Sequence, residues 1–190
     1  VLKANGVKAD YWKTGHSYIK RYSHETGALV GFEKSGHYFF NPPLGRGYDD
    51  GLIAAFAVLD MLDRNPGQTL ADLRRALPRT WQSPTMSPHC EDEVKYAVVD
   101  RVVDHFQKVA TNGGMLAGQK IRELITVNGI RIVLDDGTWG LVRASSNKPE
   151  LVVVVESPTS EAKMRAMFGE IDAELAKQPE VGAYNQIGRA

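Results

Sequence analysis

The stretch Arg143-Ala144-Ser145-Ser146-Asn147-Lys148-Pro149 lies between two apolar runs, at 139–142 and 151–155. The two runs predict neighbouring strands of a sheet, joined by the polar stretch as a loop. The fixed fork of donors on Arg143 matches a phosphate group bidentately, and the hydroxyls, amide and backbone N–H groups that follow it can complete a cradle for an anion. Serine, asparagine and proline are also common in plain turns, so this loop alone leaves an ordinary connection open.

The sequence around this loop predicts an α+β domain. Asn128-Gly129 between apolar runs is the strongest short hairpin signal, and Asp135-Asp136-Gly137 fits a turn far better than a metal site. The order helix, strands, helix indicates an antiparallel sheet that is covered on one face. The expected elements are a helix that begins at Glu91 and is broken at 112–114, strands at 124–127, 130–134, 139–142 and 151–155, and a last helix at about 160–177.

The first part of the chain has a different pattern, in which loops separate short apolar segments. The expected elements are a strand at 9–12, a helix from Ser17 that stops at Gly27, a strand at 28–32, a packed helix at 52–62 capped by Asp49 or Asp50, and a shorter helix at 70–77 capped by Thr69. Residues 78–88, rich in proline, predict the boundary between two domains, 1–79 and 80–190.

Two groups of polar residues in this first domain are candidates for a binding site. Thr14-Gly15-His16 falls between the carboxyl end of an expected strand and the amino end of an expected helix, where ligands bind in open α/β sheets. Glu33, Ser35 and His37 stand at alternate positions, which places them on one face if the segment is extended.

Composition limits the function classes. The chain has 190 residues, 43% of them hydrophobic and 24% charged, as in ordinary globular proteins. Lys+Arg and Asp+Glu balance at 23 each, which argues against a nucleic-acid or anionic-membrane partner. Cys90 is the only cysteine, so an internal disulfide is excluded and a reducing compartment is favoured. No apolar run is long enough to span a bilayer, and because the chain does not begin with Met we expect the true N-terminus to be missing.

Four segments of the sequence form one pattern: Lys-Thr-Gly-His at 13–16, Phe-Glu-Lys-Ser-Gly-His at 32–37, Asp-Asp-Gly at 49–51 and the loop at 143–149. Together they resemble the α-D-phosphohexomutase superfamily, specifically its bacterial phosphomannomutase/phosphoglucomutase enzymes. The order and approximate spacing agree along nearly the whole chain. Two departures are visible: Phe32 stands where the family has glycine, and Ser146-Asn147 stands where it has Asn-Thr.

The resemblance implies most of a third domain, an incomplete three-layer α/β sugar-binding domain, followed by a fourth, phosphate-binding α+β domain with a TATA-binding-protein-like antiparallel sheet. It implies an intramolecular phosphotransferase that interconverts hexose 1- and 6-phosphates of glucose and mannose through a hexose 1,6-bisphosphate. The phosphoserine and the Mg²⁺ loop belong to N-terminal domains that this chain lacks, so no metal ligand is expected here, the chain alone should be inactive, and its partners are those domains and a phosphorylated hexose.

The resemblance also implies roles for particular residues and a cytoplasmic location. His37 is the candidate acid or base, although hydrogen bonding to a sugar hydroxyl alone is equally open. The implied sugar-binding residues are Glu33, Ser35 and His16, and the implied phosphate-binding residues are Arg143, Ser145, Ser146 and Asn147. The alternatives are a non-catalytic sugar-phosphate-binding or regulatory module and, disfavoured by the charge balance, a nucleic-acid-binding domain.

Overall fold

In the computed structural model, which describes residues 1–184, the chain forms two units. Unit 1 is Val1–Pro78 and unit 2 begins at Arg79. Each unit is described below by itself.

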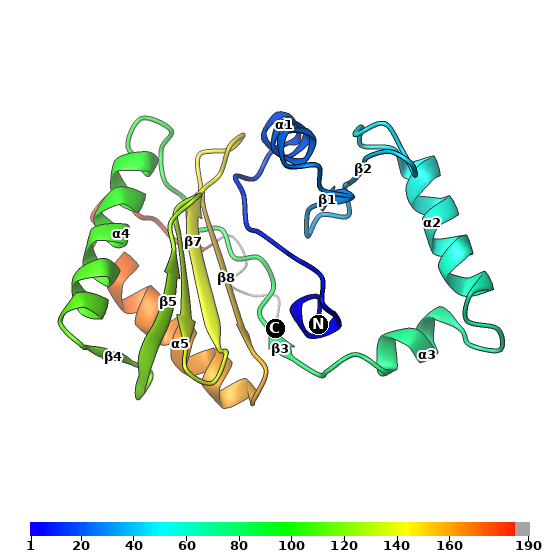
Figure 1. Ribbon diagram of the computed structural model, residues 1–190. Helices are drawn as coiled ribbons and strands as arrows, with labels where there is room; N and C mark the ends of the chain where they lie inside the picture. Colours follow the sequence, from blue (N-terminus) through cyan, green and yellow to red (C-terminus); the bar gives the residue numbers. More distant parts are fainter. Residues whose placement is uncertain (185–190) are drawn as a thin grey trace. The chain divides into compact units, whose positions relative to one another are not determined.

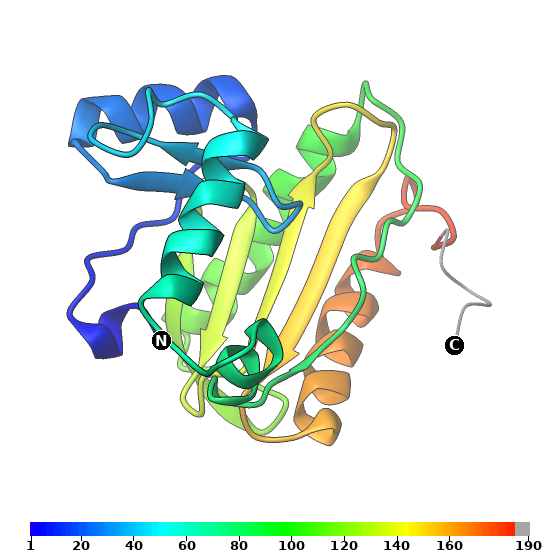
Figure 2. The same cartoon turned by 90° about the vertical axis from the view of Figure 1, so that its right-hand side faces the viewer.

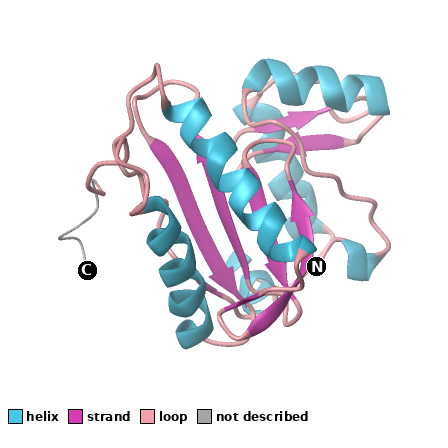
Figure 3. Ribbon diagram, turned by 90° about the vertical axis from the view of Figure 1, so that its left-hand side faces the viewer, coloured by secondary structure: helices cyan, strands magenta, loops and turns pink. Residues whose placement is uncertain are grey.

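Unit 2 is built on a six-stranded antiparallel sheet with the strand order β3-β8-β7-β6-β5-β4. Helix α4 packs on β5, β6 and β7, and helix α5 packs on β7, β8 and β3. Both helices lie on the same face of the sheet (Figures 1 and 3). The elements are β3 (Trp81–Gln82), α4 (Lys95–Thr111), β4 (Met115–Leu116), β5 (Gln119–Ile125), β6 (Ile130–Leu134), β7 (Trp139–Ala144), β8 (Leu151–Ser157) and α5 (Glu161–Leu175).

The core of unit 2 lies between the sheet and these two helices. Residues four apart on each helix share one face, and alternate residues of each strand point to the same side, so both contribute apolar stripes to one layer. The fully buried side chains include Val98, Val102 and Phe106 of α4, Met167 and Ile171 of α5, Ile130, Ile132 and Leu134 of β6, Val142 of β7, and Leu151, Val153 and Val155 of β8.

The structure confirms the antiparallel sheet covered on one face, the hairpin at Asn128-Gly129 and the pairing of β7 with β8. One expectation was wrong: helix α4 begins at Lys95, because Glu91 starts a turn in which its carbonyl accepts from the amides of Val94 and Lys95. The division between the units falls at the start of the proline-rich segment, and most of that segment belongs to unit 2, where β3 pairs with β8 and Met86 forms a bridge to Val153.

Unit 1 combines helices with a two-stranded antiparallel sheet, in which Val30 pairs with Phe40 and Phe32 with Tyr38. Helix α1 packs on β1 and helix α2 on β2. Phe39 is its buried aromatic side chain, 1% exposed. The elements are η1 (Lys3–Asn5), α1 (His16–Thr26), β1 (Val30–Phe32), β2 (Tyr38–Phe40), α2 (Gly51–Asp63) and α3 (Leu70–Arg75).

Unit 1 departs from the expectations in two places. Residues 9–12 form no strand: Trp12 stacks on Tyr22 at a centroid distance of 3.9 Å, and no strand among residues 1–184 supplies a hydrogen-bonding edge there. Helix α2 exists and contacts β2, but it is not the packed helix that was expected, because none of its residues is buried. The Thr69 cap is confirmed, with a reciprocal capping box to Asp72.

Candidate functional site

The segment 33–37 is the turn of the β1–β2 hairpin. The amide of Glu33 donates to the carbonyl of His37 at 3.0 Å, and the amide of Gly36 donates to the carbonyl of Glu33 at 3.0 Å. The expectation of one extended face was therefore wrong, because Gly36 adopts a φ of 92° and the chain reverses within the motif. Ser35 and His37 nevertheless remain exposed at the tip of the same hairpin.

The carboxylate of Glu33 connects the two candidate motifs of unit 1. Its Oε1 accepts from the backbone N–H of Gly15 at 2.9 Å, and its Oε2 accepts from the hydroxyl of Ser35 at 3.2 Å. Gly15 has a φ of 131° and directly precedes α1, so His16 is the first residue of that helix. The fold therefore brings the segment at 13–16 and the hairpin turn together, as a shared binding site requires.

His37 has a carboxylate partner that the sequence did not reveal. Its Nδ1 lies 2.6 Å from Oδ2 of Asp49, and the two side chains are 53% and 30% exposed. Asp50 is the cap of α2, since its Oδ1 accepts from the amides of Leu52 and Ile53. Because one residue holds the cap position, the adjacent carboxylate of the Asp-Asp pair is left for another partner, and this was the signal available in the sequence.

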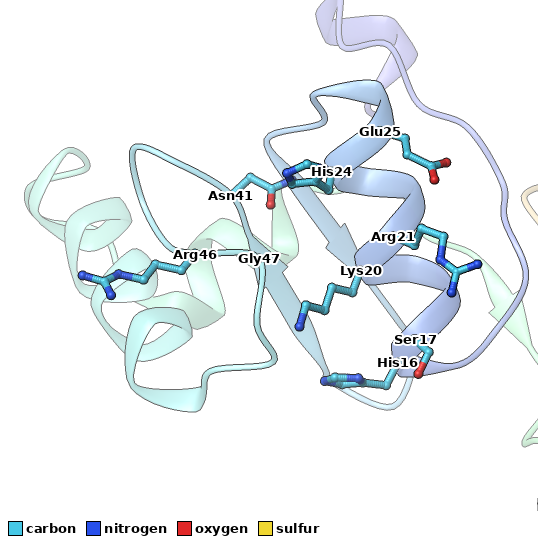
Figure 4. A pocket seen from close by; sticks show the side chains of 9 residues that line it. All are labelled: His16, Ser17, Lys20, Arg21, His24, Glu25, Asn41, Arg46 and Gly47. Carbon is cyan, nitrogen blue, oxygen red and sulfur yellow. The ribbon is translucent and has the colours of Figure 1, made fainter.

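His16 lines a shallow hollow of about 440 Å³ beside α1 (Figure 4). Its ring meets the buried Phe39 edge-on at 5.2 Å. Lys20 and His24 follow at intervals of four residues and point from α1 to the same side, and the Lys20 ammonium lies 4.4 Å from the centre of the Tyr48 ring. The lining residues are His16, Ser17, Lys20, Arg21, His24, Glu25, Asn41, Arg46 and Gly47. Donors and cations outnumber the single acid, so the hollow suits an anionic or hydroxyl-rich ligand.

Arg143 lies on β7, half-buried, with its Nη1 donating to the carbonyl of Ala144 at 3.0 Å. Gly140 of the same strand faces α5, because a Cβ there would meet Ile171 and Met167. Strand alternation places Arg143 on the opposite face, away from the two helices. Gly129, in the turn between β5 and β6, lies directly against β7 at Arg143. Its φ is 67°, and a Cβ there would collide with the carbonyl of Val142 and approach Cα of Arg143 to 2.8 Å.

The loop that joins β7 to β8 is drawn in yellow in Figure 2. A backbone hydrogen bond joins its two ends, and the residues at its tip are exposed. The amide of Ser145 donates to the carbonyl of Glu150 at 3.0 Å, and its hydroxyl donates to Oδ1 of Asn147 at 3.2 Å. Ser145 is only 4% exposed, so in this structure its side chain braces the loop. Ser146 and Asn147 are exposed, and a ligand can reach them directly.

Other functional chemistry is limited among the described residues. Within residues 1–184, no three His, Cys, Asp or Glu side chains are grouped so that they could hold a metal ion, so these residues do not fit a Mg²⁺ site. No helix in the described part is long and apolar enough to cross a membrane. Burial, with the nearby Glu180, raises the pKa of the Cys90 thiol, which makes it a poor nucleophile.

Comparisons with known proteins match both halves of the chain. A family model described as "Phosphoglucomutase/phosphomannomutase, alpha/beta/alpha domain III" matches residues 1–81, and one described as "Phosphoglucomutase/phosphomannomutase, C-terminal domain" matches residues 91–174. The chain belongs to the phosphoglucomutase/phosphomannomutase family and corresponds to these two domains of it. The family resemblance and the mixed α/β fold class expected from the sequence are thus confirmed.

Individual relatives agree. A phosphomannomutase/phosphoglucomutase of Pseudomonas syringae pv. tomato is 33% identical over 93% of this chain and 35% of its own length. A phosphoglucomutase of Neisseria meningitidis is 35% identical over 85% of this chain and 32% of its own length. A crystal structure of a phosphoglucomutase/phosphomannomutase family protein from Burkholderia thailandensis superposes with a TM-score of 0.75, at 29% identity over 95% of this chain and 35% of that one. The chain spans about a third of the length of the relatives it matches.

Proposed function

We propose that this chain supplies the sugar and phosphate recognition of a phosphohexomutase, an intramolecular phosphotransferase that interconverts hexose 1-phosphate and hexose 6-phosphate. The observation that carries the proposal is the Glu33 carboxylate, which binds the Gly15 amide and the Ser35 hydroxyl and so gathers both motifs of unit 1. The exposed tip of the β7–β8 loop provides the second half of the recognition.

Each side chain has a role in the proposal that follows from its chemistry. Glu33 accepts from sugar hydroxyls, and Ser35 donates to them by giving up the hydrogen bond that it makes to Glu33 in this structure, while His16 contributes a donor beside the hollow. Arg143 forks onto the distal phosphate, with Ser146 and Asn147 as further donors. Ser145, braced within the loop, joins them only by exchanging its contact with Asn147 for one with the phosphate.

His37 is proposed to hold or move a proton at its Nε2. A carboxylate only accepts, so the Nδ1 that faces Asp49 donates to it, and in the neutral imidazole the Nε2 lone pair is then left for a sugar hydroxyl. That hydroxyl loses its proton as it attacks a phosphoryl group. The phosphoserine, the Mg²⁺ that neutralises charge on that group, and the site that turns over the hexose 1,6-bisphosphate belong to parts of the protein outside this chain. A cytoplasmic location belongs to the same proposal and rests on the single buried cysteine.

The first test is an assay of the purified chain with glucose 1-phosphate. The proposal expects no glucose 6-phosphate from the chain alone, and turnover when the domains that carry the phosphoserine and the Mg²⁺ loop are present in the full-length protein. Interconversion by the chain alone contradicts the proposal that the reaction needs domains outside this chain. A full-length protein that binds sugar phosphate without turnover indicates the non-catalytic module instead.

A second test concerns the choice of sugar. Glucose and mannose differ only at C2, and the family's glutamate and serine are directed at O3 and O4, so these two residues cannot distinguish them. Glu33→Ala in the full-length protein should therefore lower kcat/KM for glucose 1-phosphate and mannose 1-phosphate by similar factors. A loss confined to one sugar shows that Glu33 reads C2.

A further inference from the structure

Lys95, the first residue of α4, carries a charge that is almost completely removed from solvent. Its side chain is 4% exposed, and its ammonium donates to Oδ1 of Asp92 at 2.5 Å and to the backbone carbonyl of Lys148 at 3.0 Å. Burying an ammonium group is unfavourable unless it is paired and hydrogen-bonded. These two acceptors therefore fix where the ammonium lies, and one of them belongs to the loop between β7 and β8.

The Lys148 carbonyl belongs to a set of hydrogen bonds that shape that loop. It also accepts from the amide of Glu150 at 2.8 Å, while the carbonyl of Glu150 accepts from the amide of Ser145 at 3.0 Å. The next carbonyl along the chain, that of Pro149, accepts from the amide of Cys90 at 3.0 Å. The direction of the Lys148 carbonyl thus sets the peptide between Lys148 and Pro149, directly after the exposed tip at Ser146 and Asn147, and Lys95 is the side chain that holds it.

We propose that Lys95 is a positioning residue for the phosphate loop, which keeps residues 145–148 in the conformation that presents Ser146 and Asn147 to an anion. The phosphate part of this proposal rests on the proposed function, whereas the hold on the loop does not. Lys95 acts through geometry more than through its charge, because Asp92 neutralises that charge at close range. If Lys95 only supported the folding of α4, its replacement would leave the loop unchanged.

The main experiment compares Lys95→Met with Lys108→Met in the 190-residue chain. Lys108 lies in the last turn of the same helix and is exposed, so its replacement is a matched control. Binding of inorganic phosphate and of glucose 1-phosphate is measured by NMR titration, and amide hydrogen exchange is followed at Ser145, Glu150 and Cys90. We expect Lys95→Met to weaken both ligands about tenfold, the order seen when support behind a ligand-binding group is lost. We also expect it to lower protection at those three amides, with no change in β6 or α5.

Asp92→Asn is the second variant, and it tests the positioning role of Lys95 if Lys95→Met does not fold. It keeps an acceptor for the ammonium but removes the neutralising charge. A positioning role predicts phosphate affinity that is unchanged or weaker, with faster exchange at the Glu150 amide, whereas a purely electrostatic role predicts tighter binding and overturns the proposal. Unchanged affinity and unchanged loop exchange in Lys95→Met also overturn it. If the unmodified chain binds neither ligand, the proposed function loses its phosphate part, while hydrogen exchange still tests the hold of Lys95 on the loop.

Discussion

Helices α2 and α4 show how differently the two units use apolar residues. In α4, Val98, Val102 and Phe106 recur at intervals of four residues and are buried, while the residues between them are largely polar. In α2, apolar residues fill every position from 52 to 59, and none is buried. Its side chains Leu52, Phe56 and Leu59 are 66%, 58% and 58% exposed. Apolar content therefore predicted both helices, but only a stripe with helical spacing predicted burial.

The two units should consequently respond very differently to loss of a phenylalanine. Phe106→Ala removes a side chain that is 1% exposed, and we expect it to lower the free energy of unfolding of unit 2 by roughly 3–5 kcal/mol. Phe56→Ala removes one that is 58% exposed, and its effect should stay within about 0.5 kcal/mol. Denaturant unfolding followed separately by signals from each unit measures both. Equal losses would contradict the contrast between the helices.

The β1–β2 and β5–β6 hairpin turns offer a second comparison. Gly129 and Gly36 both have positive φ, at 67° and 92°, but only Gly129 lies against another strand. Gly36→Ala should lower stability by roughly 1–2 kcal/mol through backbone conformation alone. Gly129→Ala must in addition displace β7 next to Arg143, so we expect a loss larger by at least about 1 kcal/mol and weaker phosphate binding. Similar losses in thermal unfolding, with phosphate affinity intact, show that Gly129 does not support Arg143.

Asp136 lies in a third hairpin turn, between β6 and β7, whose contribution to stability depends on pH. Burial opposes its ionisation, but hydrogen bonds from Thr138 at 2.8 Å and Thr159 at 3.0 Å outweigh it and lower the pKa of Asp136 below the ordinary 3.8. A lowered folded-state pKa stabilises the fold above the unfolded-state pKa, and this stability is lost as the pH falls toward the folded-state pKa. Asp136→Ala should cost about 1–2 kcal/mol at pH 7 and progressively less below about pH 4.

The control for this prediction is Asp135→Ala at the neighbouring exposed position, measured over the same pH range. A difference between Asp136→Ala and the unmodified chain that stays constant down to pH 2 assigns the effect to packing.

The smallest expected effect separates the adjacent residues Asp49 and Asp50. Asp50→Ala removes the cap of α2 and should cost about 1 kcal/mol of helix stability. Asp49→Ala should leave stability within about 0.5 kcal/mol, because its partner His37 is 53% exposed. Circular dichroism during thermal unfolding compares the two variants. A larger loss of stability for Asp49→Ala than for Asp50→Ala would show that the contact between Asp49 and His37 stabilises the fold.

These comparisons also show what the sequence could predict. The Asn128-Gly129 turn, the Thr69 cap and the valine-rich β8 depend on local chemistry, and each was recognised. The motif residues of the candidate site were found through the family pattern, but their partners were not. The contacts of Glu33 with Gly15, of His37 with Asp49 and of Lys95 with Lys148 join residues that are 18, 12 and 53 positions apart, and no local pattern carries such information.

The failures have the same origin. Residues 9–12 have the alternation of a strand, but a strand exists only where a neighbour completes its hydrogen bonds. The spacing of Glu33, Ser35 and His37 suited an extended segment as well as a turn, and the positive φ of Gly36 decided for the turn.

Recognition of the sugar by the β1–β2 hairpin and of the phosphate by the β7–β8 loop is tested most directly by an NMR titration of the 190-residue chain. The ligands are glucose, inorganic phosphate and glucose 1-phosphate. We expect amide shifts at residues 33–37 with glucose, shifts at 144–148 with phosphate, and shifts at both with glucose 1-phosphate, with Arg143→Ala removing only the second set. Saturating glucose 1-phosphate that moves neither set of amides would contradict this assignment of the sugar and the phosphate.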